Sequence, residues 1–237
     1  MQKLNIPTGE ICLTGSQAGE RVYTAAEIEA IKQRREQKML SEIMRARTDH
    51  SKRIIANSGL KDAIKTLRFD NFTAESDWQR NMKAVAVHYA QNPDDWMLLS
   101  GQSGCGKTHL CTAVAGTLLD RNIPVRYMRW RIDSGKLKAN YAEPEQVYAE
   151  LSKYINTPCL YLDDLFKGKI TDSDIKLAFA LIDGRYSANR KTIISTERTP
   201  EELLDIDEAT GGRILEKCRE HMFTVRKDRS KNYRLTR

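Results

Sequence analysis

The hydrophobic and polar positions of this 237-residue chain follow a helical period first and an alternation of strands and helices later. An amphipathic stretch opens at Thr24, with Glu27 in capping-box spacing, and continues to about Arg47. Its apolar side consists of Ile28, Ile31, Met39, Ile43 and Met44. That side is too narrow for a helix buried deep in a core and suits a helix that docks on a partner or on its own domain. A second short helix is predicted from about Leu60 to Leu67.

From about residue 76 onward, short apolar runs alternate with amphipathic segments. Ser76 is a predicted N-cap, with Gln79 three residues later, and its helix ends near Asn92–Pro93. Strands are predicted at 96–100, 124–130, 159–164 and 191–196. Helices are predicted at 107–120, 145–155, 171–188, 200–205 and 208–219, with extended runs at 222–226 and 232–236. This alternation predicts an α/β domain with a largely parallel sheet flanked by helices.

The amino-acid composition excludes several classes of protein and of site. No apolar run approaches the roughly 20 residues that span a bilayer, and no secretory signal opens the chain. Cysteine is odd in number, scattered and without C-x-x-C pairs, which argues against a disulfide framework and a zinc site. The composition therefore predicts a cytoplasmic protein without a membrane partner.

Basic charge is concentrated in three blocks, at residues 32–53, 121–138 and 213–237, while residues 139–212 are acidic overall. Blocks of this kind are typical of a protein that binds a polyanion such as nucleic acid. A solvated basic face without a partner explains the charge equally well.

The segment "GQSGCGKTHL" (101–110) carries the chemistry that the pattern alone does not give. It matches the complete P-loop motif and lies between a predicted strand and a predicted helix. Backbone N–H groups of the loop and the helix N-terminus are expected to bind phosphates, Lys107 to reach the β- and γ-phosphates, and the Thr108 hydroxyl to ligate Mg²⁺. The expected nucleotide contacts are Gly101, Gly104, Cys105, Gly106, Lys107, Thr108 and His109.

A second motif, "CLYLDDL" (159–165), is an apolar strand that ends in two acids. Behind a P-loop, this pattern predicts a Walker B element in which Asp163 holds Mg²⁺ through water and Asp164 orients or deprotonates the attacking water. A second acid is useful to a hydrolase and less so to a small-molecule kinase, and N-K-x-D, the base-recognition signal of GTPases, is absent from the sequence. The motifs therefore predict an ATPase that uses ATP and Mg²⁺.

Taken together, "GQSGCGKTHL", "CLYLDDLFKGKI" and "KTIISTERTPEELLDIDEATGGRI" resemble the AAA+ ATPases of the DnaC/IstB group, and most of all the phage and bacterial DnaC-like helicase loaders. The resemblance runs from about Phe69 to the C-terminus. It implies an AAA+ P-loop core at residues 66–237 and a helical, helicase-interacting region at residues 1–65. It also implies the lack of a C-terminal lid domain, since only Glu220 to Arg237 follow the last helix.

The same resemblance implies two further catalytic residues and self-association. Thr196 is placed like the polar sensor of the γ-phosphate, with an uncertainty of one residue because Ser195 and Glu197 flank it. Arg213 is placed like the arginine finger that reaches a neighbouring subunit's nucleotide. Lys217 and Arg219 remain alternatives for this role. Without a lid, closure of the site is expected to depend on the neighbour, and ATP turnover by the isolated protein is expected to be weak.

For single-stranded DNA, the expected contacts are Phe166, Lys167 and Lys169, because the segment "FKGKIT" directly follows the catalytic acids. The segment "RYMRWRIDSGKLK" (126–138) mixes cations and aromatic residues, but at least one of Tyr127 and Trp130 is expected to pack in the core, because alternate strand residues point inward.

Three functions fit the sequence. The leading hypothesis is an ATP-dependent loader that binds single-stranded DNA and delivers a hexameric replicative helicase. The second is an IstB-like transposition helper that acts on double-stranded DNA. The third is a nucleotide-binding scaffold with little turnover, because the Asp163–Asp164 pair replaces the more usual Asp-Glu and the shorter Asp164 reaches the water less well.

Overall fold

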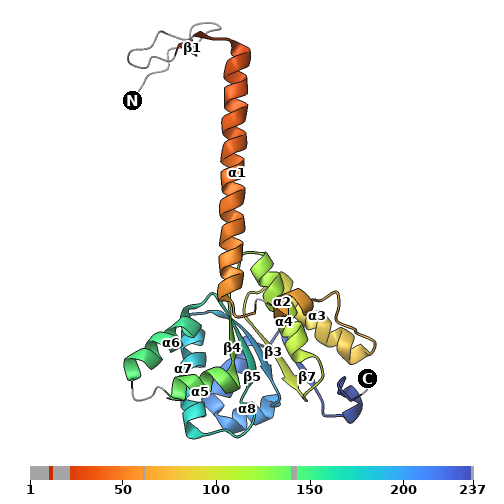
Figure 1. The fold of residues 1–237 in the computed structure, drawn as a ribbon. Helices are drawn as coiled ribbons and strands as arrows, with labels where there is room; N and C mark the ends of the chain where they lie inside the picture. Colours follow the sequence, from red (N-terminus) through yellow and green to blue (C-terminus); the bar gives the residue numbers. More distant parts are fainter. Residues whose placement is uncertain (1–10, 13–21, 61, 140–142, 236–237) are drawn as a thin grey trace. The chain divides into compact units, whose positions relative to one another are not determined.

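The computed structural model describes residues 11–12, 22–60, 62–139 and 143–235 (Figure 1). Contacts divide the chain into two compact units, of which the first ends at His50 and the second begins at Ser51. Within the described residues, no helix is both long enough and apolar enough to cross a membrane.

The first unit contains a short antiparallel pair, β1 (Ile11–Cys12) and β2 (Val22–Tyr23), and most of helix α1 (Ala25–Asn57). The predicted capping box is confirmed: the Glu27 carboxylate accepts from the Thr24 N–H at 2.9 Å, and the Thr24 hydroxyl accepts from the Glu27 N–H at 3.3 Å. The helix continues beyond Arg47, where the sequence pattern weakened. Its apolar side is exposed at Met39, Leu40, Ile43 and Met44.

The second unit begins earlier than the boundary expected after residue 65. Ile54 and Ile55, at the end of α1, pack against the buried cluster that contains Leu60 and Ile64. These residues therefore belong to the core of the α/β unit, and only the part of α1 before Ser51 lies in the first unit.

The second unit is organised around a five-stranded sheet in which every pair is parallel, in the order β4-β5-β6-β3-β7. Its strands are β3 (Trp96–Gly101), β4 (Val125–Arg129), β5 (Cys159–Leu165), β6 (Lys191–Thr196) and β7 (Met222–Val225). The central strands are apolar and almost fully buried, as expected when helices cover both faces of a parallel sheet. The predicted parallel α/β sheet is thus confirmed.

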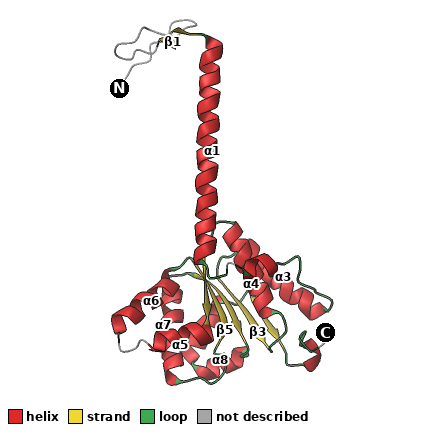
Figure 2. Ribbon diagram, viewed as in Figure 1, coloured by secondary structure: helices red, strands yellow, loops and turns green. Residues whose placement is uncertain are grey.

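Helices cover the two faces of this sheet (Figure 2). Each face packs against its helices in a separate apolar core. Alternate residues of β3 show the division: Met97 and Leu99 pack into the first core, and Trp96 and Leu98 into the second. The first core is covered by α2 (Ala63–Thr66), α3 (Asp77–Gln91) and α4 (Lys107–Asp120). The second is covered by α5 (Trp130–Ala139), α6 (Pro144–Asn156), α7 (Asp172–Ser187), α8 (Pro200–Ile206) and α9 (Glu208–Lys217).

One local expectation was incomplete and another was wrong. The predicted strand at 124–130 ends at Arg129, and residues 130–139 form helix α5; Trp130 is buried at the start of this helix, which confirms that at least one of Tyr127 and Trp130 packs in the core. The run at 232–236 is not a strand within its described part, because the 3-10 turn η1 (Arg229–Lys231) and a further turn follow β7. From Cys218 to Leu235 the described chain contains no helical lid.

Candidate active site

The P-loop connects the end of β3 to the start of α4, in the strand–loop–helix context that the motif requires. Gly106 adopts the left-handed conformation immediately before the helix, with φ +95°. A Cβ atom at Gly106 would lie 2.7 Å from the Phe72 ring, so no larger side chain fits between the loop and the segment that precedes α3. The N–H groups of Lys107, Thr108 and His109 open α4 and precede its first hydrogen bond, from the Leu110 N–H to the Gly106 carbonyl, so these three groups can bind an anion at the loop.

Lys107 is buried under this loop, with only 5% of its surface exposed. Its ammonium group donates hydrogen bonds of 2.7 Å to the carbonyl oxygens of Gly101 and Gln102. The charge is therefore held inside the loop, among the backbone groups that cradle phosphates in this motif.

Cys105 is a packing residue of the loop. It is buried and its thiol donates to the Gln102 carbonyl. Burial raises the pKa of this thiol, which outweighs the opposing charge of Lys107. A reactive thiolate is therefore disfavoured, and a role in nucleotide binding falls to the backbone of Cys105.

The carboxylate of Asp163, on β5, contacts side chains from β4, β5, β6 and the helix α4 that follows the P-loop. Its carboxylate accepts hydrogen bonds from four hydroxyl groups, those of Tyr127 (2.8 Å), Tyr161 (2.9 Å), Ser195 (2.5 Å) and Thr108 (3.3 Å). The two residues expected to hold Mg²⁺, Thr108 and Asp163, are thus in direct contact. A carboxylate beside a threonine hydroxyl is an oxygen donor set that suits Mg²⁺.

The two tyrosines around Asp163 stay protonated donors. Burial, followed by the negative charge of Asp163, raises the pKa of Tyr127 above its ordinary value. Burial also raises the pKa of Tyr161, with Asp163 contributing in the same direction. Sequence analysis did not identify either hydroxyl as part of the site, since nothing in an apolar strand marks which tyrosine will face a carboxylate.

Asp164 leaves the sheet because the β5–β6 ladder shifts register between Leu162 and Leu165. Its φ of +59° lies in the left-handed region, where Asp is one of the few tolerated residues. The side chain forms a 2.9 Å ion pair with Lys167, whose ammonium group is also 3.2 Å from the Glu197 carboxylate. This register shift therefore directs the side chains of Asp163 and Asp164 to different partners.

At the end of β6, the residue that contacts the acids is Ser195. Its hydroxyl donates to Asp163 and accepts the Asp164 N–H at 2.9 Å. The hydroxyl of Thr196 is fully buried and is used by the backbone, since it donates to the Leu165 carbonyl and accepts from the Arg198 N–H. The structure thus brings Ser195, rather than Thr196, into contact with the predicted Walker B element.

A cavity of about 470 Å³ opens over the P-loop. Its walls include Thr108, Asp164, Lys167 and Glu197 on the side of the acids. Its lining also includes Phe72, Thr73, Trp78, Gln79 and His109, and Tyr233 and Arg234 of the C-terminal segment. His109 is fixed in this wall, with its Nε2 atom 2.9 Å from the Arg68 carbonyl and its ring edge-on to Phe72. A nucleotide on the P-loop would occupy this cavity.

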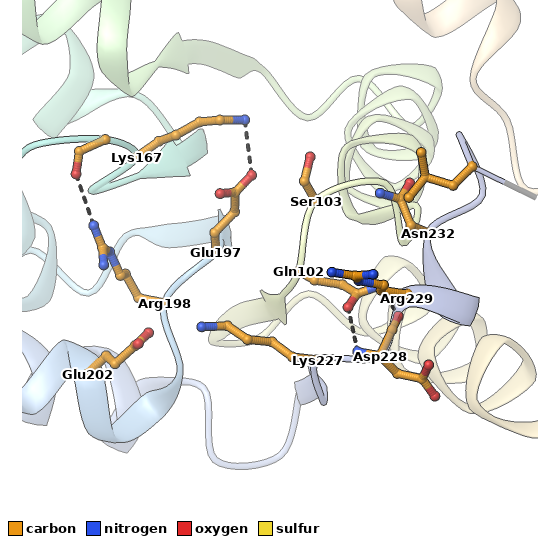
Figure 3. Close-up of a pocket in the computed structure, with 12 residues that line it drawn as sticks. Gln102, Ser103, Lys167, Glu197, Arg198, Glu202, Lys227, Asp228, Arg229 and Asn232 are labelled. Carbon is orange, nitrogen blue, oxygen red and sulfur yellow. Dashed lines mark hydrogen bonds and ion pairs between the residues drawn. The ribbon is translucent and has the colours of Figure 1, made fainter.

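A second hollow of about 680 Å³, lined mostly by charged and amide side chains, also borders the P-loop at Gln102 and Ser103 (Figure 3). Lys167 and Glu197 line both spaces, and their ion pair is visible in the close-up. Arg198 reaches across to the turn after β5 and donates to the Gly168 carbonyl at 3.0 Å.

The three candidates for an arginine finger differ in their surroundings. Arg213 forms a 3.0 Å ion pair with Asp183 and lies over the rings of Phe179 and Tyr186. Lys217 pairs with Asp95 at 3.3 Å. Arg219 is exposed, and within the described part of the chain its side chain forms no hydrogen bond or ion pair.

Two of the three expected DNA contacts require revision. Phe166 is only 1% exposed and packs edge-on against Trp130, so it belongs to the core and has no face available for a base. Lys167 is an ion-pair partner of the site's acids. Lys169 is exposed at the rim of a small hollow that is also lined by Arg131 and Lys138 of α5.

Two curated relatives are similar to this chain in sequence. The uncharacterised protein YqaM of Bacillus subtilis (strain 168) is 32% identical over 77% of this chain and 63% of its own length. The replicative helicase loader DnaC of Escherichia coli (strain K12) is 26% identical over 70% of this chain and 69% of its own length. The chain thus spans less than two thirds of YqaM and slightly more than two thirds of DnaC.

Solved structures show the same fold. A crystal structure of the DnaC helicase loader superimposes with a TM-score of 0.59 at 21% identity, covering 70% of this chain and 99% of that chain. The structure of the replication initiator DnaA, bound to AMPPCP and single-stranded DNA, superimposes with a TM-score of 0.58 at 18% identity. The match covers 70% of this chain and 51% of that chain. The family model for IstB-like ATP binding proteins matches residues 16–235. The chain therefore belongs to the IstB-like ATP-binding family, and its fold is shared with the DnaC helicase loader and with DnaA.

Proposed function

We propose that this chain is an ATP-dependent, DnaC-like helicase loader that binds single-stranded DNA and delivers a hexameric replicative helicase during initiation of DNA replication. The observation that carries the proposal is the direct contact between the P-loop and the acids of β5, where the Thr108 hydroxyl lies 3.3 Å from Asp163. The relatives named replicative helicase loader support the choice of this function within the family.

In the proposed ATPase reaction, Lys107 and the N–H groups of the P-loop bind the phosphates of ATP. Asp164 accepts the proton of the attacking water, and its position outside the ladder gives its carboxylate access to the cavity. Ser195 fixes the backbone of Asp164 and the carboxylate of Asp163 at the same time. Thr108 and Asp163 would hold Mg²⁺, which would neutralise phosphate charge.

We assign the trans-acting role to Arg219. Arg213 and Lys217 are paired with acids of their own chain, whereas the exposed Arg219 is available to a neighbouring subunit. A mixing experiment tests this assignment. Arg219→Ala and Lys107→Ala are each expected to lose ATP turnover, and a mixture is expected to regain part of it, because some interfaces then combine an intact P-loop with an intact Arg219. No recovery, or normal turnover by Arg219→Ala alone, would contradict the assignment.

For DNA, the proposed contact surface is the basic rim formed by Lys169, Arg131 and Lys138. Lys138 also pairs with the buried Asp174 at 2.6 Å, so Arg131 and Lys169 supply the freer charges. The first unit is proposed to bind the helicase through the exposed apolar residues of α1, namely Met39, Leu40, Ile43 and Met44.

The function is tested by ATP turnover with and without single-stranded DNA and by capture of a replicative helicase. The wild-type chain is expected to hydrolyse ATP faster with single-stranded DNA, and Lys107→Ala is expected to abolish turnover. Met39→Ser combined with Ile43→Ser should lose helicase binding while ATP turnover is retained. If double-stranded DNA alone stimulates turnover and no helicase is captured, the IstB-like transposition helper is the correct function; its family description already makes it the second candidate.

A third outcome concerns turnover itself. A nucleotide-binding scaffold would show the same low rate in the wild-type chain and in Asp164→Asn. A loader that uses Asp164 as its base should instead lose turnover in that variant while ATP still binds.

A further inference from the structure

Three cations of helix α1 share one side of the helix. At about 100° per residue, Arg34, Lys38 and Arg45 fall within a sector about 40° wide. These three residues are called the basic face below. They lie before Ser51, within the first unit, and all three are exposed. The exposed apolar side chains of the same helix, at residues 39, 40, 43 and 44, lie on roughly the opposite side.

No acid lies within the basic face. The four acids of α1 that follow its first turn all lie outside this sector, namely Glu29, Glu36, Glu42 and Asp49. The ion pair that the structure describes on α1 joins Glu29 to Lys32, away from the basic face. Within the described residues, the side chains of the basic face form no ion pair and no hydrogen bond.

The cations of the basic face are also uncovered. Ser41, which lies between Lys38 and Arg45 along the helix, is small, and its hydroxyl donates to the Lys38 carbonyl at 2.7 Å. Arg34 and Lys38 are four residues apart, the spacing at which two like charges destabilise a helix. An arrangement that opposes helix formation in the free chain becomes favourable when a polyanion is bound.

The chemistry of α1 favours a duplex over a single strand as this polyanion. Proteins that bind single strands combine a basic track with aromatic side chains on which bases stack. Helix α1 contains no Phe, Trp or Tyr, so it offers charge without stacking. A duplex carries about one charge per 1.7 Å of its axis and is bound without sequence preference through its phosphates alone. The rise from Arg34 to Arg45 is about 16 Å, which corresponds to about five base pairs.

A membrane surface fits α1 less well. Helices that lie in a membrane interface bury a large apolar face, in which Trp, Phe and Leu are common. Among the described residues of α1, the exposed large apolar side chains are confined to residues 39–44, less than two turns of the helix. The area available for insertion is therefore small.

We propose that the basic face of α1 binds the phosphate backbone of double-stranded DNA without reading its sequence. This surface is separate from the rim of Arg131 and Lys169 proposed for single strands. It also lies on the other side of α1 from the apolar residues proposed to bind the helicase, so one helix has a side for each partner. The inference depends neither on nucleotide binding nor on helicase delivery.

Binding of the full chain to a short fluorescent duplex, measured by anisotropy without nucleotide, tests the basic face. The face variant combines Arg34→Gln, Lys38→Gln and Arg45→Gln, since glutamine is a good helix former without charge. It should bind the duplex more weakly than the wild-type chain. The slope of log K against log salt concentration should become about 2.7 smaller in magnitude, because each phosphate contact contributes about 0.9.

A matched control removes the same charge from the rest of α1. It combines Lys32→Gln, Arg35→Gln and Arg47→Gln, three exposed positions that are spread around the helix outside the basic face. The control should retain a salt dependence close to that of the wild-type chain. If the face variant and the control lose duplex affinity equally, total charge rather than the basic face causes binding, and the proposal is wrong.

Further measurements separate duplex binding from folding and from the proposed function. The face variant should keep its helix content by circular dichroism, its ATP turnover and its capture of the helicase. Met39→Ser combined with Ile43→Ser should bind the duplex like the wild-type chain. The proposal is overturned if the face variant binds the duplex normally, or if it loses affinity only for a single strand or for phosphatidylserine vesicles. A wild-type chain that binds the duplex but captures no helicase would overturn the loader function and leave the basic face in place.

Discussion

The ammonium group of Lys167 lies 2.9 Å from the carboxylate of Asp164, the residue proposed to activate water. The same ammonium group is 3.2 Å from Glu197, so one lysine joins the acid after β5 to the acid after β6. Burial lowers the pKa of Lys167, but the hydrogen bonds and charges of these two acids outweigh it and raise the pKa overall. Lys167 therefore remains charged at neutral pH, and the Asp164 carboxylate is partly occupied by a cation.

Removing this cation should free the Asp164 carboxylate to contact the attacking water. We expect Lys167→Ala to raise ATP turnover in the absence of DNA by up to about fivefold, because a partly exposed ion pair is worth up to about 1 kcal/mol and 1.36 kcal/mol corresponds to a tenfold rate. The measurement is steady-state ATP hydrolysis. Lys153→Ala is the control, since Lys153 forms a pair of the same spacing with Glu150 on α6, away from the site. A fall in turnover for Lys167→Ala would show instead that this lysine assists the reaction.

Ser195 should matter for the rate of hydrolysis more than Thr196. Its hydroxyl is 2.5 Å from Asp163 and accepts the Asp164 N–H, so Ser195→Ala releases both acids. We expect kcat to fall about tenfold with little change in ATP affinity, because a hydrogen bond to a charged group is worth about 1.5–3 kcal/mol. Thr196→Ser keeps the hydroxyl that binds the Leu165 carbonyl and should retain nearly normal turnover. A normal kcat in Ser195→Ala would show that Ser195 does not position the two acids for hydrolysis.

The fold was predictable because its signals are local. Buried parallel strands are continuous apolar runs, and the predicted strands at 96–100, 159–164 and 191–196 differ from β3, β5 and β6 by at most one residue at either end. Helix α5 was missed because residues 130–139 carry Trp130, Gly135 and scattered charges without a clear apolar period.

The site was predictable only where its residues are neighbours in sequence. The P-loop and the Asp163–Asp164 pair follow from short motifs, and the structure brings them together. Tyr127 joins them only through the β4–β5 register, which the sequence does not reveal. The segment that follows β7 reaches the P-loop only because β7 lies beside β3, a neighbour relation between strands more than a hundred residues apart in sequence.

Tyr127 should support the metal site without contacting the nucleotide itself. Its hydroxyl donates to Asp163 at 2.8 Å and stays protonated because burial and Asp163 raise its pKa. We expect Tyr127→Phe to raise the Mg²⁺ concentration for half-maximal ATP turnover about tenfold, as is typical when a partner that orients a metal ligand is lost. The free energy of unfolding of this variant should be about 1 kcal/mol lower than that of the wild-type chain, the usual contribution of one hydrogen bond. Tyr148→Phe, on an exposed side chain, is the control. An unchanged Mg²⁺ dependence would restrict Tyr127 to a structural role.

The last prediction concerns stability and pH and rests on a pair of histidines outside the nucleotide site. The Nε2 atom of His221, a buried side chain, lies 3.1 Å from Nδ1 of His88, and the two rings are stacked. Burial, followed by the charge of His88, lowers the pKa of His221, and the nearby acids Glu220, Asp95 and Asp94 oppose this only in part. Lys217 and Arg219, which line the same surface hollow, add positive charge around the pair.

Since the folded pKa of His221 lies below the unfolded value of 6.5, the unfolded chain binds a proton first as the pH falls. The contribution of His221 to stability is therefore complete above pH 6.5 and is lost as the pH falls through that value toward the folded pKa. We expect the melting temperature to decrease between pH 7.5 and pH 5.5, and to decrease less in His221→Gln, whose amide nitrogen can replace Nε2 but does not titrate. His50→Gln, on the exposed surface of α1, is the control and should retain the wild-type pH dependence. The same pH dependence in His221→Gln and the wild-type chain would show that other groups cause the acid sensitivity.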